Sequence, residues 1–194
     1  MRRSRPGLCL ILAGLALIIG AATLLLHNSR EDRRAGEAAA AVVQKLQTAL
    51  PPESSGQAAA GADMPAVEIG GYTYIGVLEL PDGGPSLPVQ SAWDEGGALV
   101  SPCRYQGSAY DGSLIVAGHN YKTGFGRLYS MAPGDAVRFT DMNGAVFEYV
   151  VSQLETVDQY DLEGMESGEW DMTLFSCTLD GRRRVAVRCV RVDG

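Results

Sequence analysis

The sequence predicts an all-β protein carried by one N-terminal transmembrane helix. Three observations support this: an uncharged apolar run near the start, short runs rich in Val, Ile, Tyr, Phe and Thr after Val67, and turn-forming clusters between those runs. Many short strands favour a sheet that closes on itself, because closure removes exposed strand edges. We therefore expect a closed or nearly closed barrel of about 130 residues after the helix.

The apolar run covers residues 7–26 and holds twenty residues without a charge. A helix of that length rises about 30 Å, which matches the hydrocarbon thickness of a bilayer. The alternative is a cleaved signal peptide ending near Ala21 and Ala22, although its apolar core usually spans about 7 to 15 residues. Arginines flank the run on both sides, so charge counts do not set its orientation. We expect an uncleaved anchor, with residues 1–6 as a cytoplasmic tail and the body of the chain outside.

Residues 27–66 are predicted to form a juxtamembrane helix and a flexible linker. Helix-forming residues continue from Glu31 to Leu50, with apolar residues at helical spacing, until Pro51 and Pro52 end the pattern. Residues 53–65 are small and polar without periodicity, which is typical of a tether. The folded domain is therefore expected to occupy residues 67–194.

The domain divides into short β-prone runs separated by turn clusters, for example at residues 81–84, 94–97 and 143–144. No run sustains a long amphipathic helix, so only short connecting helices are expected. The expected strands are residues 72–80, 114–118, 136–141, 145–155, 172–177 and 184–192.

The charge of the domain excludes one class of partner. From Met64 onward there are 18 acidic and 9 basic residues. Because binding to a phosphate backbone needs basic patches, nucleic acid is not expected as a partner. Residues 155–171 alone carry seven acidic residues and no basic one. Calcium favours clustered carboxylates and stays an alternative there, but the spacing matches no compact ligand loop and predicts a solvated, mobile loop beside the substrate.

The strongest local signal surrounds Cys177. Asp180-Gly181 between two β-prone runs predicts a two-residue hairpin turn, which pairs Cys177 with Arg184 and places Arg182 nearer the turn. Paired residues share a face, with β-carbons about 4.5 to 5.5 Å apart. A guanidinium beside a thiol stabilises the thiolate and the negative charge that develops in acyl transfer. The alternative is a core cysteine beside solvated arginines.

His119 is the second candidate. It follows the apolar run 114–118 directly after Gly118, a position typical of a general acid or base, although a hydrogen-bonded structural histidine remains the alternative. His27 closes the membrane helix, so His119 is the only imidazole in the domain. If Cys177 is a nucleophile that needs an imidazole, His119 must supply it.

The remaining cysteines give weaker information. Cys9 lies in the membrane helix, which leaves Cys103, Cys177 and Cys189 in the domain, and an odd count implies at least one free thiol. Cys103 and Cys189 either form a disulfide or remain two buried thiols. Three cysteines without CxxC spacing and one histidine make a poor zinc site, so no metal and no cofactor are expected.

Together these residues resemble the sortases, the cysteine transpeptidases of bacterial cell surfaces. The resemblance rests on TLFSC ending in Cys177, on RVAVR starting at Arg184, on GHN around His119 and on the N-terminal anchor. It covers roughly residues 72–192, and the motifs occur in the family's order.

The resemblance implies a closed eight-stranded β-barrel and a mechanism. Cys177 would attack a C-terminal sorting signal, LPXTG-like or NPQTN-like, and form a thioacyl enzyme that an amine on a peptidoglycan precursor resolves. His119 would act as general acid and base, while Arg184 would orient the substrate and stabilise the oxyanion. The implied partners are secreted proteins that bear the signal, at the membrane surface of a Gram-positive bacterium. Further candidates for substrate binding are Ser176, Asn120 and Arg182.

Some features depart from the family pattern. Ser176 stands where sortases commonly have Thr, which keeps the hydroxyl with a less restricted rotamer. The GHN and CRYQGS stretches look closest to class B, with a class D-like enzyme as an alternative, whereas the lack of an Asp-Pro-aromatic lid disfavours class C. Two other functions stay open: a membrane-anchored cysteine hydrolase on the same barrel, and a non-catalytic surface-binding barrel in which Cys177 is structural.

Overall fold

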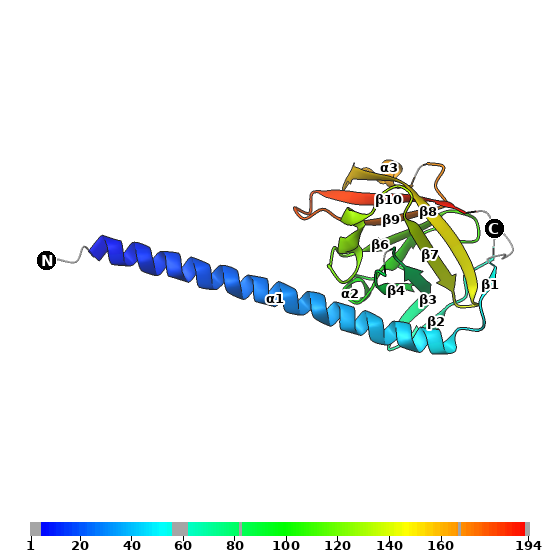
Figure 1. Ribbon diagram of the computed structural model, residues 1–194, viewed down its shortest axis with the longest axis horizontal. Helices are drawn as coiled ribbons and strands as arrows, with labels where there is room; N and C mark the ends of the chain where they lie inside the picture. Colours follow the sequence, from blue (N-terminus) through cyan, green and yellow to red (C-terminus); the bar gives the residue numbers. More distant parts are fainter. Residues whose placement is uncertain (1–4, 56–61, 82, 167, 193–194) are drawn as a thin grey trace. The chain divides into compact units, whose positions relative to one another are not determined.

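A computed structural model describes residues 5–55, 62–81, 83–166 and 168–192 (Figure 1). The chain divides into two compact units, Met1–Arg34 and Ala35–Gly194. The first unit contains the apolar part of helix α1 (Arg5–Ala49), which is long and apolar enough to cross a membrane. Its large apolar side chains are exposed, which suits contact with lipid. The expected cytoplasmic tail, residues 1–6, lies mostly outside the described residues.

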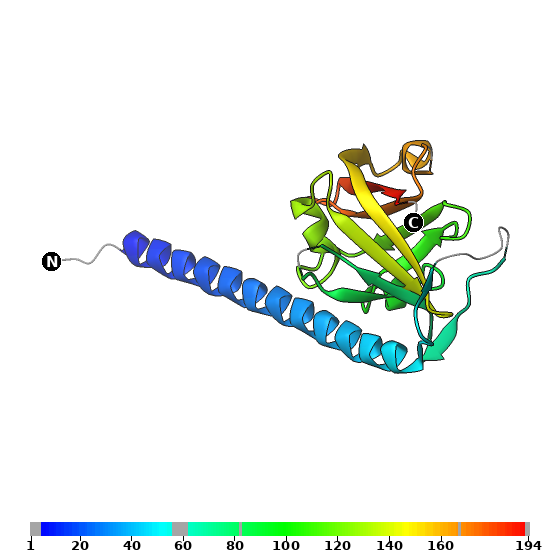
Figure 2. The ribbon, with the colours of Figure 1, turned by 45° about the vertical axis from the view of Figure 1, so that its right-hand side comes forward.

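Eight strands of the second unit form a closed barrel (Figures 1 and 2). Neighbouring strands follow the order β3, β4, β5, β6, β9, β10, β8 and β7, and β7 pairs back with β3. The closed eight-stranded barrel that the sequence predicts is therefore confirmed. Its strands are β3 (Tyr72–Glu79), β4 (Ser86–Gln90), β5 (Cys103–Gln106), β6 (Leu114–Gly118), β7 (Ala136–Asp141), β8 (Ala145–Asp158), β9 (Met172–Cys177) and β10 (Arg183–Arg191).

Two of the barrel strands, β4 and β5, were not expected from the sequence. β4 contains Pro88, which lacks the N–H group that a central strand uses and is therefore read as a strand breaker. β5 has only four residues and is mostly polar, so it carries little of the alternation that identifies a strand. Short helices connect the strands, as expected: α2 (Glu95–Ala98), the 3-10 helix η1 (Phe125–Ser130) and α3 (Leu162–Glu166).

The second unit begins earlier than the Val67 boundary that the sequence predicts. Val43 and Leu46 near the end of α1 are buried against Tyr74 and Val77 of β3, because the helix presents an apolar stripe there. Within the expected tether, β1 (Ser54–Ser55) pairs in parallel with β8, while residues 56–61 lie outside the described part of the chain. A further short strand, β2 (Val67–Ile69), pairs with β3.

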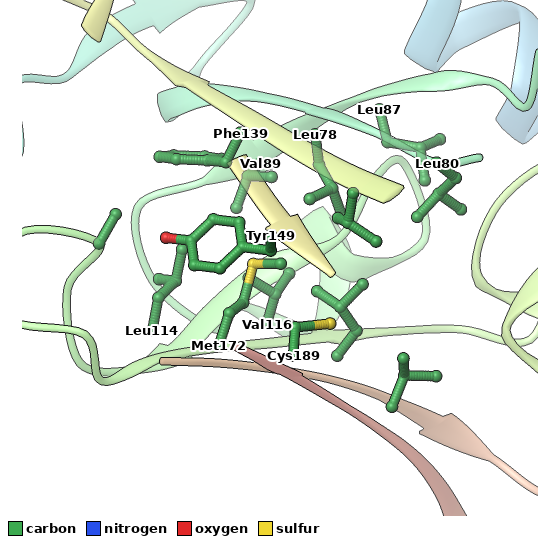
Figure 3. Packing of buried hydrophobic residues seen from close by; sticks show 14 of the residues in the cluster. Leu78, Leu80, Leu87, Val89, Leu114, Val116, Phe139, Tyr149, Met172 and Cys189 are labelled. Carbon is green, nitrogen blue, oxygen red and sulfur yellow. The ribbon is translucent and has the colours of Figure 1, made fainter. Parts of the chain in front are cut away.

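The barrel interior is filled by apolar side chains from most of the strands. Figure 3 shows Leu78, Val116, Phe139, Met172 and Cys189 meeting in this core, and all five are fully buried. The strands are thereby held in register, because a shift by one residue would turn each inward side chain to the outside. The packed barrel therefore holds the ends of β6, β9 and β10 in place, and the candidate residues lie at these ends.

Candidate active site

Cys177 lies at the end of β9, between two neighbouring strands that each contribute a candidate residue. On one side, β6 runs parallel to β9 and pairs Gly118 with Ser176, so His119 and Cys177 both follow directly after paired residues. On the other side, β10 runs antiparallel and pairs Arg184 with Cys177. Adjacent strands lie about 4.8 Å apart, so the three side chains start from backbone positions next to one another.

The predicted pairing of Cys177 with Arg184 is confirmed, but the turn differs from the prediction. The last backbone bond of the ladder runs from Thr178 N–H to the Arg183 carbonyl (2.9 Å), which leaves a loop of four residues, 179–182, instead of two. Within the turn, Gly181 N–H donates to the carbonyl of Thr178 (2.8 Å). The reason is the Thr178 side chain, because its hydroxyl oxygen accepts a bond from Arg183 N–H (3.0 Å) and closes the ladder there. A four-residue loop centred on the same point keeps the register of the strands, which explains why the pairing was still predicted correctly.

The longer loop changes the position expected for Arg182. Its side chain is exposed in the loop and does not line the cleft beside Cys177. Asn120 is half-buried and likewise lies outside the lining of that cleft. Ser176 does line the cleft, is buried, and its hydroxyl has no hydrogen-bond partner among the described residues.

Arg184 is half-buried and reaches back over the hairpin. Its Nη1 donates to the carbonyls of Arg183 (3.2 Å) and Gly181 (3.4 Å). A guanidinium has five N–H donors, so bonds from Nη1 alone leave the others for a bound oxygen. The hairpin backbone therefore orients a cation that lines the same cleft as Cys177.

Two aromatic rings lie near His119, and one of its nitrogens makes no hydrogen bond to the described residues. Its ring lies 6.4 Å from that of Trp93 and 5.8 Å from that of Tyr121, measured between centroids. The Nε2 atom is buried and has no hydrogen-bond partner within the described part of the chain. A purely structural histidine would normally satisfy such an atom, so this arrangement favours an imidazole that acts on a ligand.

A cleft of about 290 Å³ is lined by His119, Ser176, Cys177 and Arg184. One side is apolar: Tyr105 and Phe175 pack edge to face with centroids 5.4 Å apart, and the buried Met165 lies beside them. The other lining residues include the exposed carboxylates Asp158 and Asp161. The cleft can therefore hold an apolar peptide segment next to the thiol, with charged groups at its rim.

The other cysteines of the domain differ sharply from Cys177. Cys103 and Cys189 are free thiols and fully buried, which settles the open question of a disulfide between them. Burial raises the pKa of Cys103, and it raises the pKa of Cys189 to about 12, so both stay protonated near neutral pH. Cys177 is partly exposed in the cleft, which argues against the alternative of a core cysteine.

Two residues near the site gave no signal in the sequence. Tyr129 on η1 donates its hydroxyl to the backbone carbonyl of Cys177 (3.0 Å), a contact between residues 48 positions apart. Arg188 is fully buried on β10, pairs with Glu155 of β8 and binds the Met165 carbonyl in α3.

Residues 155–171 differ in part from the predicted solvated, mobile loop. Their first residues belong to β8, α3 occupies residues 162–166, and Met165 is buried. Five of the seven carboxylates are exposed, as predicted, and the mobility of the segment stays a prediction. Among the described residues, no three His, Cys, Asp or Glu side chains gather as metal ligands would, and calcium binding stays untested.

A closed barrel with this cleft is the architecture of a cysteine transpeptidase. The family model described as the sortase domain matches residues 78–192, which is more than half of the chain. The chain therefore belongs to the sortase family. A comparison with curated protein sequences found no match.

Solved sortase structures share the fold. Sortase C1 from Streptococcus agalactiae is 26% identical, with a TM-score of 0.54, over 62% of this chain and 68% of that one. Sortase C1 from Streptococcus suis is 21% identical, with a TM-score of 0.55, over 62% and 74%. A sortase D5 transpeptidase from Clostridium perfringens is 17% identical, with a TM-score of 0.54, over 62% and 79%. These relatives are class C and class D enzymes, and the expected likeness to class B is not confirmed.

Proposed function

We propose that this protein is a membrane-anchored sortase that cuts a C-terminal sorting signal, LPXTG-like or NPQTN-like, and transfers the protein to a cell-wall amine. The observation that carries the proposal is the arrangement at one end of the barrel. Cys177 on β9 lies between His119, which follows the parallel strand β6, and Arg184 on the antiparallel strand β10. A thiol, an acid–base group and a fixed cation are the three groups that acyl transfer through a thioester needs.

Each group has a role in a balanced reaction. The Cys177 thiolate attacks the carbonyl carbon of the scissile peptide bond, and the carbon–nitrogen bond breaks as a carbon–sulfur bond forms. His119 donates a proton to the leaving amine and takes one from the incoming amine, which attacks the thioester, breaks the carbon–sulfur bond and restores the Cys177 thiolate. Arg184 orients the peptide and stabilises the oxyanion through N–H groups that the hairpin carbonyls leave available.

The apolar helix and the family support a cellular setting at the outer face of the membrane. Helix α1 is long and apolar enough to hold the barrel at a membrane. With its N-terminus in the cytoplasm, the barrel lies at the outer surface of a Gram-positive cell, where both secreted proteins and cell-wall precursors are present. The donor is a protein with a sorting signal and the acceptor is an amine on a peptidoglycan precursor. No cofactor takes part in these steps.

The test uses the full chain in detergent micelles with peptides that carry LPXTG-like or NPQTN-like signals, with and without triglycine. Intact mass spectrometry is expected to detect a thioacyl adduct on Cys177, and a ligated product only when triglycine is present. Cys177→Ala must abolish both, whereas Cys103→Ala, which removes a buried thiol, must retain both. Adduct followed by hydrolysis alone, with every amine, would favour the hydrolase instead. No adduct with any peptide would overturn the proposal.

A further inference from the structure

Arg188 is the largest fully buried side chain of the described residues, with 1% of its surface exposed. Removing a guanidinium from water is costly unless the group is paired and fully hydrogen-bonded. Its Nε donates to Glu155 Oε1 (2.6 Å), and its Nη1 donates to Thr173 Oγ1 (3.0 Å) and to the Met165 carbonyl (2.9 Å). Its Nη2 donates to the Gly164 carbonyl. The side chain thus joins β8, β9 and α3 around one buried charge.

The two backbone carbonyls belong to α3, a helix of five residues. Such a short helix is not stable alone, because nucleation is costly and its last carbonyls have no partner within the helix. Arg188 binds two of those carbonyls, and at the other end the Asp161 carboxylate accepts a bond from Gly164 N–H (2.8 Å). Met165 is buried with Ala186 and Val157 beneath it. Helix α3 is therefore capped at both ends and packed through Met165.

The segment that Arg188 holds forms one wall of the cleft. Met165 and Asp161 line the cleft from this connection, as do Asp158 and Gln159 just before α3. Arg188 itself does not line it. Side chains two and four positions apart share a face of a strand, so Arg184 and Arg188 lie on the same face of β10. Arg184 lines the cleft, and Arg188 supports the wall of the cleft that contains α3.

The wall adjoins the apolar side of the cleft, close to the thiol. Met165 packs with Phe175, and Phe175 precedes Cys177 by two residues, so both lie on the same face of β9. An apolar residue of an acyl-donor peptide that reaches Cys177 would contact this surface. A small amine acceptor needs only the thioester, so the wall matters less for it.

We propose that Arg188 is a positioning residue for the acyl-donor peptide, acting through the cleft wall that contains α3. The inference rests on the proposed function, because it concerns the peptide that Cys177 would attack. Without the guanidinium, the wall loses its anchor, and a donor peptide must order the wall as it binds. Binding of the donor weakens, while the chemistry at Cys177 proceeds once the donor is bound.

The experiment compares Arg188→Met and Arg188→Lys with a matched control, Arg138→Met. Arg138 also forms ion pairs with two carboxylates, Glu53 and Glu79, but it lies on β7 outside the cleft. Hydrogen exchange of the amides of residues 162–166 reports on the wall in the full chain in micelles. Donor KM, kcat and the KM for triglycine report on the reaction, and the rate of Cys177 alkylation by iodoacetamide reports on the thiol itself.

In Arg188→Met we expect faster exchange at residues 162–166 and a donor KM raised about tenfold, with kcat, the KM for triglycine and alkylation each within about twofold. Arg188→Lys restores part of the donor KM, because an ammonium can still bond the α3 carbonyls. Arg138→Met leaves all these values near wild type. If Arg188→Met does not fold, Glu155→Gln removes only the charge partner and is expected to raise the donor KM about threefold.

Several outcomes would overturn the inference. Unchanged exchange at residues 162–166 would show that Arg188 does not hold the wall. Faster exchange with an unchanged donor KM would show that the wall does not position the donor. An equal fall of every activity, with a lower Tm, would indicate a general structural role. If the wild type forms no adduct with any peptide, the proposed function fails and donor positioning fails with it, while hydrogen exchange still decides whether Arg188 anchors α3.

Discussion

The hydroxyl of Tyr129 donates a hydrogen bond of 3.0 Å to the backbone carbonyl of Cys177. This bond ties η1 to Cys177, the last residue of β9, one residue before the pair of Thr178 and Arg183 that closes the hairpin. The carbonyl is adjacent to the side chain that would attack the substrate, so a shift of this peptide group would move the thiol. Tyr129 is 42% exposed, and the bond is therefore a constraint at the surface and not part of the core.

Tyr129→Phe removes this bond and keeps the ring. A hydrogen bond of this kind contributes about 1 kcal/mol, so we expect kcat to fall about fivefold, with a small loss of stability. Steady-state kinetics with the best donor peptide measure the effect. Tyr160→Phe is the control, because Tyr160 is 83% exposed and its loss should change nothing. Equal kcat values for the two variants would contradict a positioning role for Tyr129.

Arg184 and Arg183 allow a direct comparison of two neighbouring arginines. Arg184 pairs with Cys177 and lines the cleft, whereas the Arg183 side chain is exposed outside it. Loss of a donor that stabilises an oxyanion costs about 10²- to 10³-fold in rate, and we expect that loss in kcat/KM for Arg184→Gln. Arg183→Gln should stay within about twofold. Comparable losses in both variants would show that the charge of the hairpin, not the position of one guanidinium, supports the reaction.

The sequence allowed the site to be predicted where local rules decide the structure. Strands β6, β7 and β9 begin and end at the predicted residues, because apolar runs between turn clusters determine them. The pairing of Cys177 with Arg184 follows from the position of Asp180-Gly181, and it survives an error in loop length because both loops share a centre.

Contacts between distant segments could not be predicted in this way. The bond between Tyr129 and Cys177 depends on how η1 packs against the barrel, which no local pattern encodes. In the sequence, Arg188 is one of several arginines near the end of the chain. Only the folded barrel shows that it is buried and bound to α3. For the same reason, the acidic run at residues 155–171 gave no sign that Arg188 on β10 binds Glu155 and two carbonyls of α3.

The three thiols of the barrel are expected to differ in reactivity. In a Cys9→Ala chain at pH 8, iodoacetamide should label Cys177 and spare Cys103 and Cys189, because burial raises the pKa of both of these thiols and shields them. Peptide mass spectrometry after digestion measures the labelling, and the unfolded chain, which should label at all three, is the control. Labelling of Cys189 at the rate of Cys177 in the folded protein would contradict the buried placement.

Burial of Cys189 also makes the stability of the protein depend on pH. The pKa of Cys189 lies above its unfolded value of 9.0, so its contribution to stability is complete below pH 9 and is lost as the pH rises towards 12.

Closure of the barrel depends on Gly76 of β3, which lies opposite Asp141 of β7. A methyl group at this position would overlap the carbonyl oxygen of Thr140 and the ring of Phe139. Because the oxygen belongs to the backbone, the strands must separate, and we expect Gly76→Ala to lower the free energy of unfolding by about 3 kcal/mol.

The matched control for Gly76→Ala is Gly70→Ala in the turn between β2 and β3. Gly70 has a φ of 63°, and nothing lies within 4 Å of an added Cβ, so its substitution brings only backbone strain of about 1 kcal/mol. Thermal unfolding of the full chain in micelles compares the two variants. If Gly76→Ala proves no more destabilising than Gly70→Ala, then β3 and β7 do not pack as closely as the closed barrel requires. The contact between β3 and β7 lies away from the cleft. Any Gly76→Ala protein that remains folded should therefore still form the thioacyl adduct on Cys177.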